Sequence, residues 1–334
     1  MTKSILITGG TGSFGRKFIR NLLETNNEWE RIIIFSRDEL KQWEMQNKYP
    51  QEKFKKLRYF LGDIRDYNRL KRACQGVDTI IHAAALKQVP AAEYNPTEFI
   101  NTNIIGSQNV VEAATDCGVK KIIALSTDKA SSPINLYGAT KLCSDKLFVA
   151  ANRYTGHKIK CSIVRYGNVM GSRGSVIPIF LKQKKEGRLT ITDPEMTRFN
   201  ITLSQAINVV KYSLEHSIGG EIFVPKMPSY SVKTVALAIG EGLKLDIVGR
   251  RAGEKKHEEL FHSQDCHELL ETSGMYIISC GMNRDQYKEK WIDQYSDNIK
   301  LSQRSADYSS DTNSNFLAVE ELKKLINQIG DDMI

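Results

Sequence analysis

The chain has 334 residues, of which 41% are hydrophobic and 26% charged, as expected for an ordinary globular protein with a well-buried core. No apolar run approaches the roughly 18 residues that span a bilayer, so we expect no membrane helix. The formal charge of +8 suits anionic nucleotides, and no basic stripe with interleaved aromatic residues supports nucleic acid as a partner. The six scattered cysteines form no Cys-x-x-Cys pair, which predicts reduced thiols in a cytoplasmic protein and no metal site.

A glycine-rich turn follows the first predicted strand, residues 4–8, and leads into a helical pattern at 14–25. The strand begins so early that no room is left for a signal peptide. Strand, glycine turn and helix in this order are typical of a dinucleotide-binding fold, although the spacing Gly-x-x-Gly-x-x-Gly differs from that of ordinary dehydrogenases and could alone be a simple turn. We predict that the turn and the helix N-terminus contact a dinucleotide cofactor through Gly9, Thr11, Gly12, Ser13, Phe14 and Gly15.

The second predicted strand, residues 31–35, is followed by Ser36, Arg37 and Asp38. An acidic residue at this point usually binds the bare ribose of NAD, whereas an arginine favours the 2′-phosphate of NADP. Because Arg37 comes before the acid, the sequence favours NADP over NAD, with Lys41 in the same site. The alternative is that Arg37 stacks on the adenine or faces solvent.

Two further strands are predicted at 56–61 and 79–83, and a helix at 101–117. Their carboxyl ends lie at the ligand-binding edge of an open α/β sheet. His82 lies within an apolar run, which favours a structural role. Further cofactor contacts are expected at Asp63, Ile64, Ala83, Ala84, Lys87 and Thr102.

The central stretch of the chain follows a predicted buried strand at 121–125 and contains Thr127, Asp128 and Lys129. Tyr137 then opens a helical pattern with Lys141 four residues on, so their side chains share one helix face. A lysine beside a phenol stabilises the phenolate, and we expect the pKa of Tyr137 to lie well below its free value of about 10. A core tyrosine with a solvated lysine has the same spacing, but the hydroxyl, acid and amine just upstream favour catalysis.

The alternation of strands and helices weakens after a sixth strand at 160–165. We therefore divide the chain into a cofactor-binding domain, residues 1–170, and a smaller C-terminal α/β lobe, residues 171–334, with a strand near 221–224 returning to the first domain. Other strands are expected at 189–192 and 246–248, helices at 178–185, 203–216, 232–241 and 318–329, and an extended surface segment at 296–315. His257, His262 and His267 would lie on different faces of a helix, which argues against a metal site.

Three arginines fall in predicted loops of the C-terminal half, namely Arg173, Arg198 and Arg251. Arginine forks suit phosphate oxygens, so these side chains are candidates to bind a diphosphate. Glu254 would hold a ribose or one of the arginines. Surface arginines are common, and each of the three has a solvent-exposed alternative.

With these motifs in register, the chain resembles the extended short-chain dehydrogenases/reductases. More narrowly, it is similar to the inverting UDP-N-acetylglucosamine 4,6-dehydratases, which begin pseudaminic acid synthesis for flagellin or polysaccharide glycosylation. The likeness covers roughly residues 4–260, and its matching runs are 7–15, 36–41, 82–87, 125–147, 165–168, 172–176, 196–199 and 253–255. Asn200 departs from the pattern, because an aromatic residue is expected there.

The resemblance implies an α/β fold with a Rossmann-type doubly wound parallel sheet, tightly bound NADP and a homo-oligomer, either a dimer or a hexamer. Tyr137, assisted by Lys141, would take the proton of the sugar 4-hydroxyl, which Thr127 orients. Tyr137 and Lys141 would also contact the cofactor. A neutral Lys129 would take the C5 proton, and a protonated Asp128 would protonate the departing 6-hydroxyl. The implied UDP-sugar contacts are Lys87, Asn168, Arg173, Val176, Thr192, Arg198, Arg251 and Glu254.

Three alternatives remain at this point. A nucleotide-sugar 4-epimerase needs the cofactor and Tyr137 but no acid–base pair at Asp128 and Lys129. Members of a capsule-type dehydratase branch often lack the tyrosine. A non-catalytic NADP-sensing module has no reason to keep both catalytic groups. Larger membrane-bound relatives carry helices before the glycine turn, so this chain resembles the short soluble form.

Overall fold

The computed structural model describes residues 3–25, 28–172, 174–280 and 299–329, together with Glu289 and Trp291. A ten-stranded sheet runs through the centre of the molecule in the order β16-β14-β15-β10-β6-β5-β4-β1-β2-β3. The first six strands along the chain are all parallel. They are β1 (Lys3–Thr8), β2 (Trp29–Ser36), β3 (Leu57–Leu61), β4 (Thr79–His82), β5 (Lys121–Thr127) and β6 (Lys160–Tyr166).

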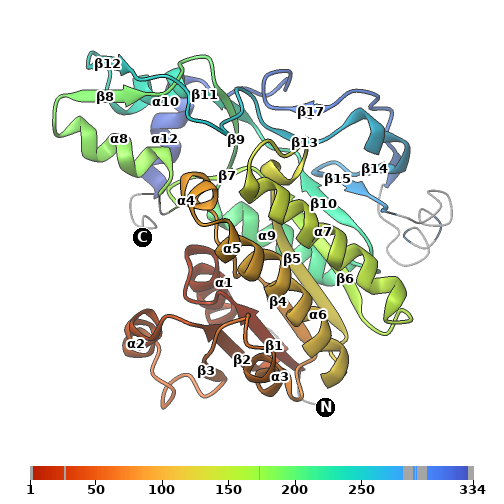
Figure 1. Ribbon diagram of the computed structural model, residues 1–334. Helices are drawn as coiled ribbons and strands as arrows, with labels where there is room; N and C mark the ends of the chain where they lie inside the picture. The colour runs from red at the N-terminus through yellow and green to blue at the C-terminus, as the bar shows by residue number, and fades with distance from the viewer. Residues whose placement is uncertain are drawn as a thin grey trace.

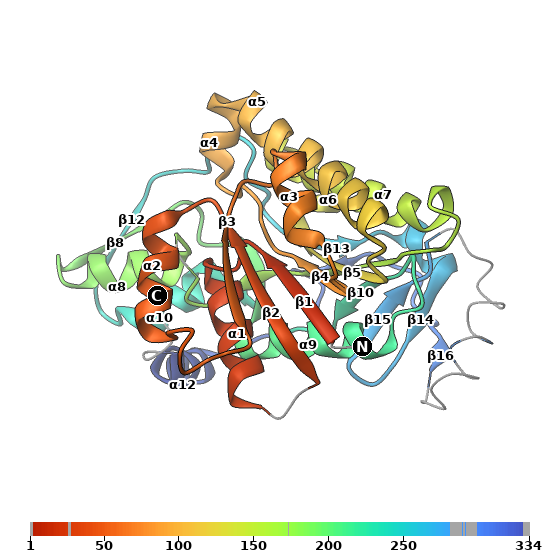
Figure 2. The same ribbon diagram turned by 90° about the horizontal axis from the view of Figure 1, so that it is seen from below.

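The order 3-2-1-4-5-6 of these strands is that of a doubly wound Rossmann fold, so the predicted fold class is confirmed. Residues 5–7 of β1, 80–82 of β4 and 122–124 of β5 are buried without interruption. Such continuous burial requires helices on both faces of the sheet. Figure 2 shows α1 (Ser13–Glu24) and α9 (Leu203–His216) below the sheet, with α3 (Tyr67–Cys74), α6 (Gly106–Cys117) and α7 (Leu136–Tyr154) above it.

Shorter elements surround the carboxyl ends of the parallel strands. They are α2 (Glu39–Lys48), α4 (Val89–Tyr94), α5 (Pro96–Phe99), a π-helix η1 (Ile100–Ile105) that precedes α6, and a 3-10 helix η2 (Asp128–Ala130) that follows β5. The predicted helix at 101–117 is therefore confirmed only from Gly106 onward as an α-helix. π-helical turns are rare and often lie at functional sites.

The C-terminal lobe packs around its own apolar core, which includes Phe180, Leu189 and Ile239. It is built from α8 (Val176–Lys184), α10 (Val232–Ile239), α12 (Val319–Ile329) and the parallel pair β8 (Arg188–Ile191) and β12 (Lys244–Ile247) (Figure 1). A three-stranded sheet of β7 (Asn168–Val169), β9 (Thr197–Ile201) and β11 (Ser229–Ser231) lies between this lobe and the Rossmann sheet.

The C-terminal half of the chain also contributes strands to the large sheet. β10 (Ile222–Pro225) pairs in parallel with β6, and the antiparallel strands β15 (Met275–Ile278), β14 (Leu269–Glu271) and β16 (Lys300–Leu301) extend the sheet beyond β10. The two halves therefore share one sheet, and the division after residue 170 stays a prediction.

Three sequence expectations in the C-terminal half were wrong. Arg198 lies in strand β9, not in a loop. The described part of the 296–315 segment is not a surface arm, because it forms β16 and β17 (Tyr308–Ser309) and buries Tyr308 and Ser310. The three histidines share no helix. His257 precedes β13 (Glu259–Phe261), His262 is the N-cap of the 3-10 helix η3 (Ser263–Glu268), and His267 lies within η3.

Within the described ranges, no helix is long and apolar enough to cross a membrane. The same residues contain no cluster of three or more His, Cys, Asp or Glu side chains that could hold a metal ion.

The first turn of α7 packs very closely on η2. A Cβ atom added at Gly138 would lie 2.2 Å from the carbonyl oxygen of Lys129, so only glycine fits without displacing the backbone. We expect Gly138→Ala to lower the free energy of unfolding by roughly 1–3 kcal/mol, as overpacking does. Gly274 is the matched control, because a Cβ atom there meets nothing within 4 Å and its φ is not positive. Urea denaturation should show Gly274→Ala within about 0.5 kcal/mol of the unmutated protein; equal effects of the two substitutions would contradict the close packing.

Candidate active site

A cleft of about 640 Å³ opens at the carboxyl ends of the parallel strands. Every residue predicted to contact the cofactor lines it: Gly9, Thr11, Gly12, Ser13, Phe14, Gly15, Ser36, Arg37, Asp38, Lys41, Asp63, Ile64, Ala83, Ala84, Lys87, Thr102, Tyr137 and Lys141. The cleft also contains Thr127, Lys129 and Asn168, which the sequence assigns to catalysis or substrate binding. Residues as far apart in sequence as Gly9 and Asn168 therefore share one cavity, and their contacts with a ligand stay predictions.

The glycine turn leaves no room for side chains. Gly9 has a φ of +67°, and a Cβ atom there would lie 2.8 Å from the backbone nitrogen of Ala84. A Cβ atom on Gly15 would lie 2.5 Å from the backbone of Gly10. The hydroxyl of Thr102 is buried in the cleft wall without a hydrogen-bond partner in the described part of the chain. This tight turn at a helix N-terminus and the unsatisfied hydroxyl fit a dinucleotide.

The end of β2 determines which groups can meet the adenosine ribose. The carboxylate of Asp38 accepts the backbone N–H of Lys41 at 3.0 Å as the N-cap of α2 and also pairs with the Lys41 ammonium. These hydrogen bonds from Lys41 hold the pKa of Asp38 below its usual value. Arg37 is half exposed, with its guanidinium 3.5 Å from an Asp63 oxygen. The Asp38 carboxylate is thus already engaged in capping α2 and in its ion pair with Lys41.

Tyr137 lies at the start of α7 and is 9% exposed. Burial raises its pKa to about 12, although the charge of Lys129 and a hydrogen bond with Thr127 act in the opposite direction. The predicted lowering of this pKa by Lys141 was wrong. The Lys141 ammonium donates instead to the carbonyl oxygen of Leu125 at 2.8 Å, and its own pKa is lowered by burial.

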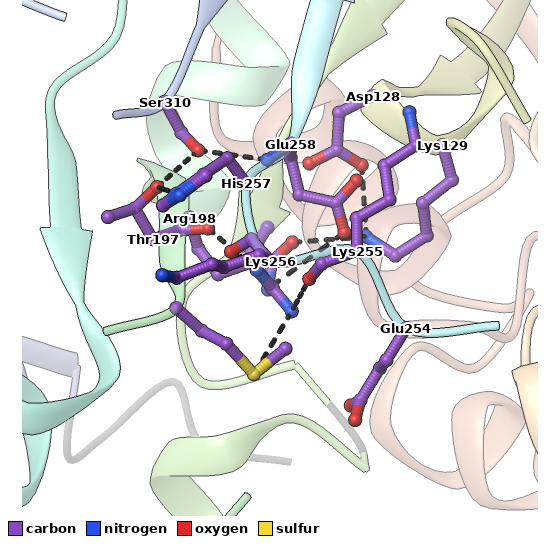
Figure 3. A network of polar contacts seen from close by, with 12 residues as sticks. Asp128, Lys129, Thr197, Arg198, Glu254, Lys255, Lys256, His257, Glu258 and Ser310 are labelled. Carbon is purple, nitrogen blue, oxygen red and sulfur yellow. Dashed lines mark hydrogen bonds and ion pairs between the residues drawn. The ribbon is translucent and has the colours of Figure 1, made fainter. Parts of the chain in front are cut away.

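Lys129 lies between two carboxylates. Its Nζ is 3.1 Å from Oδ1 of Asp128 and 3.1 Å from Oε1 of Glu258, and 3.5 Å from the side-chain oxygen of Asn168 (Figure 3). Burial alone lowers the pKa of Lys129, but Asp128 and Glu258 outweigh burial and raise it above the ordinary value. The expectation of a neutral Lys129 was therefore wrong, because the sequence pattern did not indicate the second carboxylate.

Asp128 is completely buried behind Lys129 and does not line the cleft. Its Oδ1 accepts a hydrogen bond from the Thr127 hydroxyl at 2.9 Å, and its Oδ2 has no partner among the described residues. The adjacent side chains of Asp128 and Lys129 do not diverge around a ligand but contact each other. An acid and an amine at this distance can exchange a proton directly.

Two residues of this site were missed from the sequence. Glu258 is 2% exposed and immediately precedes β13. Tyr230 of β11 is 3% exposed, its pKa is raised by burial, and its phenol is hydrogen-bonded with Asn168. Neither residue stands in a recognisable motif. The only signal for Glu258 is its place three residues after the matching run 253–255.

The predicted UDP-sugar contacts do not all reach the cleft. Arg198 is 7% exposed and donates to the backbone carbonyls of Thr197, Lys255 and Lys256 at 2.7–3.1 Å, so it holds the protein together instead of facing a diphosphate. Arg251 is exposed in its loop, where its backbone N–H donates to Glu254.

Two other residues predicted to contact the UDP-sugar are Val176, which begins α8, and Thr192, whose hydroxyl donates to the sulfur of Met196. Arg173 lies outside the described residues. Asn200, the departure from the pattern, is buried in β9 opposite Asn168.

A family model described as polysaccharide biosynthesis protein matches residues 5–280. The chain belongs to this family. Two similar proteins of Campylobacter jejuni strains are 50% and 49% identical over 97% of this chain and 97% of their own length. Both are named UDP-N-acetylglucosamine 4,6-dehydratase (inverting), which confirms the predicted resemblance.

Other relatives carry a different name. A protein of Rickettsia akari named UDP-glucose 4-epimerase is 42% identical over 97% of this chain and 95% of its own length. Among solved structures, Pen from Bacillus thuringiensis is 37% identical, with a TM-score of 0.89 and coverage of 100% of this chain and 99% of that chain. DesIV, a dTDP-glucose 4,6-dehydratase from Streptomyces venezuelae solved with NAD, shares the fold at 20% identity and a TM-score of 0.69.

The Lys129 ion pairs make a stability prediction. Lys129→Met leaves two buried carboxylates without their lysine, so we expect the free energy of unfolding to fall by about 3 kcal/mol at neutral pH. The pKa of Lys129 is raised in the folded protein, so this stabilisation is fully present below the unfolded pKa of about 10.4 and is lost only as pH rises beyond it. Denaturant titration near pH 7 measures it, with Lys146→Met on the exposed side of α7 as control. Equal stability of both variants would show that the ion pairs contribute little.

Proposed function

We propose that the protein is a C5-inverting UDP-N-acetylglucosamine 4,6-dehydratase, a hydro-lyase that converts this sugar nucleotide into UDP-2-acetamido-2,6-dideoxy-β-L-arabino-hex-4-ulose. The observation that carries the proposal is the joint position of three groups at one cleft: the glycine turn, Tyr137 and Lys129, whose ammonium contacts the Asp128 carboxylate buried behind it. The names of the two half-identical Campylobacter relatives support the same reaction.

The glycine turn and its surroundings would hold a nicotinamide cofactor. Such a cofactor, when bound, accepts a hydride from C4 of the sugar and later returns it to C6. We propose NADP as that cofactor, because Asp38 is engaged as a helix cap while Arg37 remains half exposed at the ribose end. NAD is the alternative, and it is the cofactor present in the DesIV structure.

Tyr137 would take the proton of the sugar 4-hydroxyl. Thr127, hydrogen-bonded with the phenol, would orient that hydroxyl. The positive charge of Lys129 favours the phenolate, and Lys141 fixes the first turns of α7 against Leu125 at the end of β5. Tyr137 alone provides for oxidation at C4 but not for loss of water.

Asp128 and Lys129 would carry out the elimination. Transfer of one proton from the Lys129 ammonium to Asp128, 3.1 Å away, turns the ion pair into a neutral acid and a neutral amine. The amine then takes the C5 proton, and Asp128, buried behind Lys129, would be the source of the proton that leaves with the 6-hydroxyl as water. The C5–H and C6–O bonds break, a C5–C6 double bond forms, and one water leaves.

The sugar nucleotide would contact the residues assigned to it from the sequence. Lys87 and Asn168 line the cleft, and Arg251 and Glu254 lie in a loop that is fastened to the catalytic segment by Asn135 and Lys255. Arg198 would act indirectly, through the loop whose carbonyls it binds. A homo-oligomer, a cytoplasmic location and a role in pseudaminic acid synthesis remain parts of this proposal.

A 4-epimerase is the alternative function, named for the Rickettsia relatives. Epimerisation at C4 requires hydride transfer and the tyrosine, but it has no step for a paired acid and amine at C5 and C6. The relatives with the dehydratase name are also more similar, at 50% against 42% identity. We therefore favour dehydration.

The product formed in heavy water tests the proposed function. Incubation with UDP-N-acetylglucosamine should give a product that has lost one water and carries one solvent deuterium at C5, with the L-arabino configuration. The hydrogen delivered to C6 should come from C4 of the same sugar, without solvent deuterium. Mass spectrometry and proton NMR measure these features. A product of unchanged mass would instead indicate epimerisation, and retention at C5 would rule out inversion.

Cofactor preference depends on Arg37. Because a guanidinium pairs with a 2′-phosphate, Arg37→Ala should weaken NADP binding by roughly 1.5–3 kcal/mol, the range for a charged hydrogen bond, and weaken NAD binding much less. Calorimetric titration with NADP and NAD measures the change in each affinity. The control is Arg58→Ala, near the amino-terminal end of β3. Equal weakening of both cofactors by Arg37→Ala would remove the argument for NADP.

A further inference from the structure

Glu258 is a buried carboxylate to which the proposed reaction so far gives no role. Its Oε1 lies 3.1 Å from Nζ of Lys129 and 3.7 Å from Nε of Arg198. Its Oε2 has no hydrogen-bond partner in the described part of the chain. Figure 3 shows its side chain pointing toward Lys129 beside Asp128, whereas Glu254 of the same loop points away.

The backbone of Glu258 is fixed by the C-terminal part of the chain. Its N–H donates to the Ser310 hydroxyl at 2.9 Å, and the N–H of Ser310 donates back to the Glu258 carbonyl at 2.8 Å. The same hydroxyl is 2.7 Å from that of Thr197, which also contacts His257 at 2.8 Å. The backbone that carries the Glu258 carboxylate is therefore fixed, and moving this residue out to solvent would break these hydrogen bonds.

The charges around Lys129 come from three elements and from one residue across the cleft. Asp128 and Lys129 belong to η2, Arg198 to β9, and Glu258 to the segment before β13. Lys87 adds positive charge from across the cleft, and the phenols of Tyr137 and Tyr230 are neutral, with pKa values raised by burial. Arg198 donates its shorter hydrogen bonds to three carbonyls, so the near partner of the Glu258 carboxylate is Lys129.

We propose that Glu258 is a positioning residue of the elimination step, which holds Nζ of Lys129 at the cleft and stabilises the ammonium that forms when Lys129 takes the substrate proton. The inference rests on the proposed dehydratase function, because it needs Lys129 as the base. In the step itself the C5–H bond breaks and an N–H bond forms. The new positive charge appears 3.1 Å from Oε1 of Glu258, while Asp128 supplies the proton of the leaving water.

Two carboxylates then have separate tasks at one lysine. Asp128 receives and gives up a proton, whereas Glu258 stays charged throughout and strengthens Lys129 as a base. Glu258 does not line the cleft, so its substitution should leave substrate binding nearly unchanged. Oxidation at C4 uses Tyr137 and should also persist.

Glu258→Gln keeps the shape and removes the charge. We expect kcat to fall roughly tenfold to hundredfold, the effect of one charged hydrogen bond, with little change in KM. Loss of the negative charge beside Lys129 disfavours protonation of the Asp128–Lys129 pair, so the rising limb of the pH–kcat profile, where the pair loses its first proton, should shift to lower pH. When substrate is added, the near-ultraviolet absorbance of reduced nicotinamide should build up, because oxidation continues while elimination is slow.

Two companion variants make the test specific. Glu258→Asp keeps the charge and should leave the rising limb close to that of the unmutated enzyme, although its kcat is lower. Glu259→Gln, in the next position with its carboxylate near His262, should behave as the unmutated enzyme does. The measurements are product mass, kcat and KM across pH, and absorbance in a single turnover.

The outcomes separate the inference from the proposed function. If the unmutated enzyme releases no water, the dehydratase proposal fails and the inference fails with it. If the unmutated enzyme dehydrates but Glu258→Gln keeps its kcat and pH profile, only the role of Glu258 is overturned. The same holds if Glu258→Asp shifts the rising limb as far as Glu258→Gln does, because a purely structural defect would then explain both variants.

Discussion

The ion pairs of Lys129 with two buried carboxylates are the constraint on which the rest of the site depends. An ammonium with its side chain 22% exposed, between side chains that are 1% and 2% exposed, keeps its charge only because both partners lie within 3.1 Å. The three groups come from η2 and from the segment before β13, so the Rossmann half and the C-terminal half must be in register for the cluster to form. Arg198, Ser310 and the Asn135–Gly253 hydrogen bond maintain that register.

The Rossmann half was predictable because its signals are local. Isoleucine-rich segments in β1, β4 and β5 indicate strands buried on both faces, and the Gly9 to Gly15 spacing indicates the turn that follows β1. The cofactor-side residues could be assigned from their positions after each strand, because parallel strands bring their carboxyl ends to one edge. All of them do line one cleft.

The electrostatics of the site could not be predicted in the same way. The pKa of Tyr137 depends on burial and on charges brought close by folding, and Lys141, its neighbour on the helix, turns out to bind a backbone carbonyl instead. Glu258 and Arg198 are charged side chains that become buried only through folding, Glu258 just before β13 and Arg198 within β9. The π-helix at 100–105, which carries the unsatisfied Thr102 hydroxyl, has no reliable sequence signal.

The hydrogen bonds between Ser310 and Glu258 have a consequence for how the protein is made. A chain emerging from the ribosome exposes the glycine turn and the first six strands long before the last tenth of the sequence appears. A nascent chain could thus acquire a dinucleotide site while Lys129 still lacks its second carboxylate partner in a fixed position. The acid–base centre is completed only when β17 pairs with β13, late in synthesis.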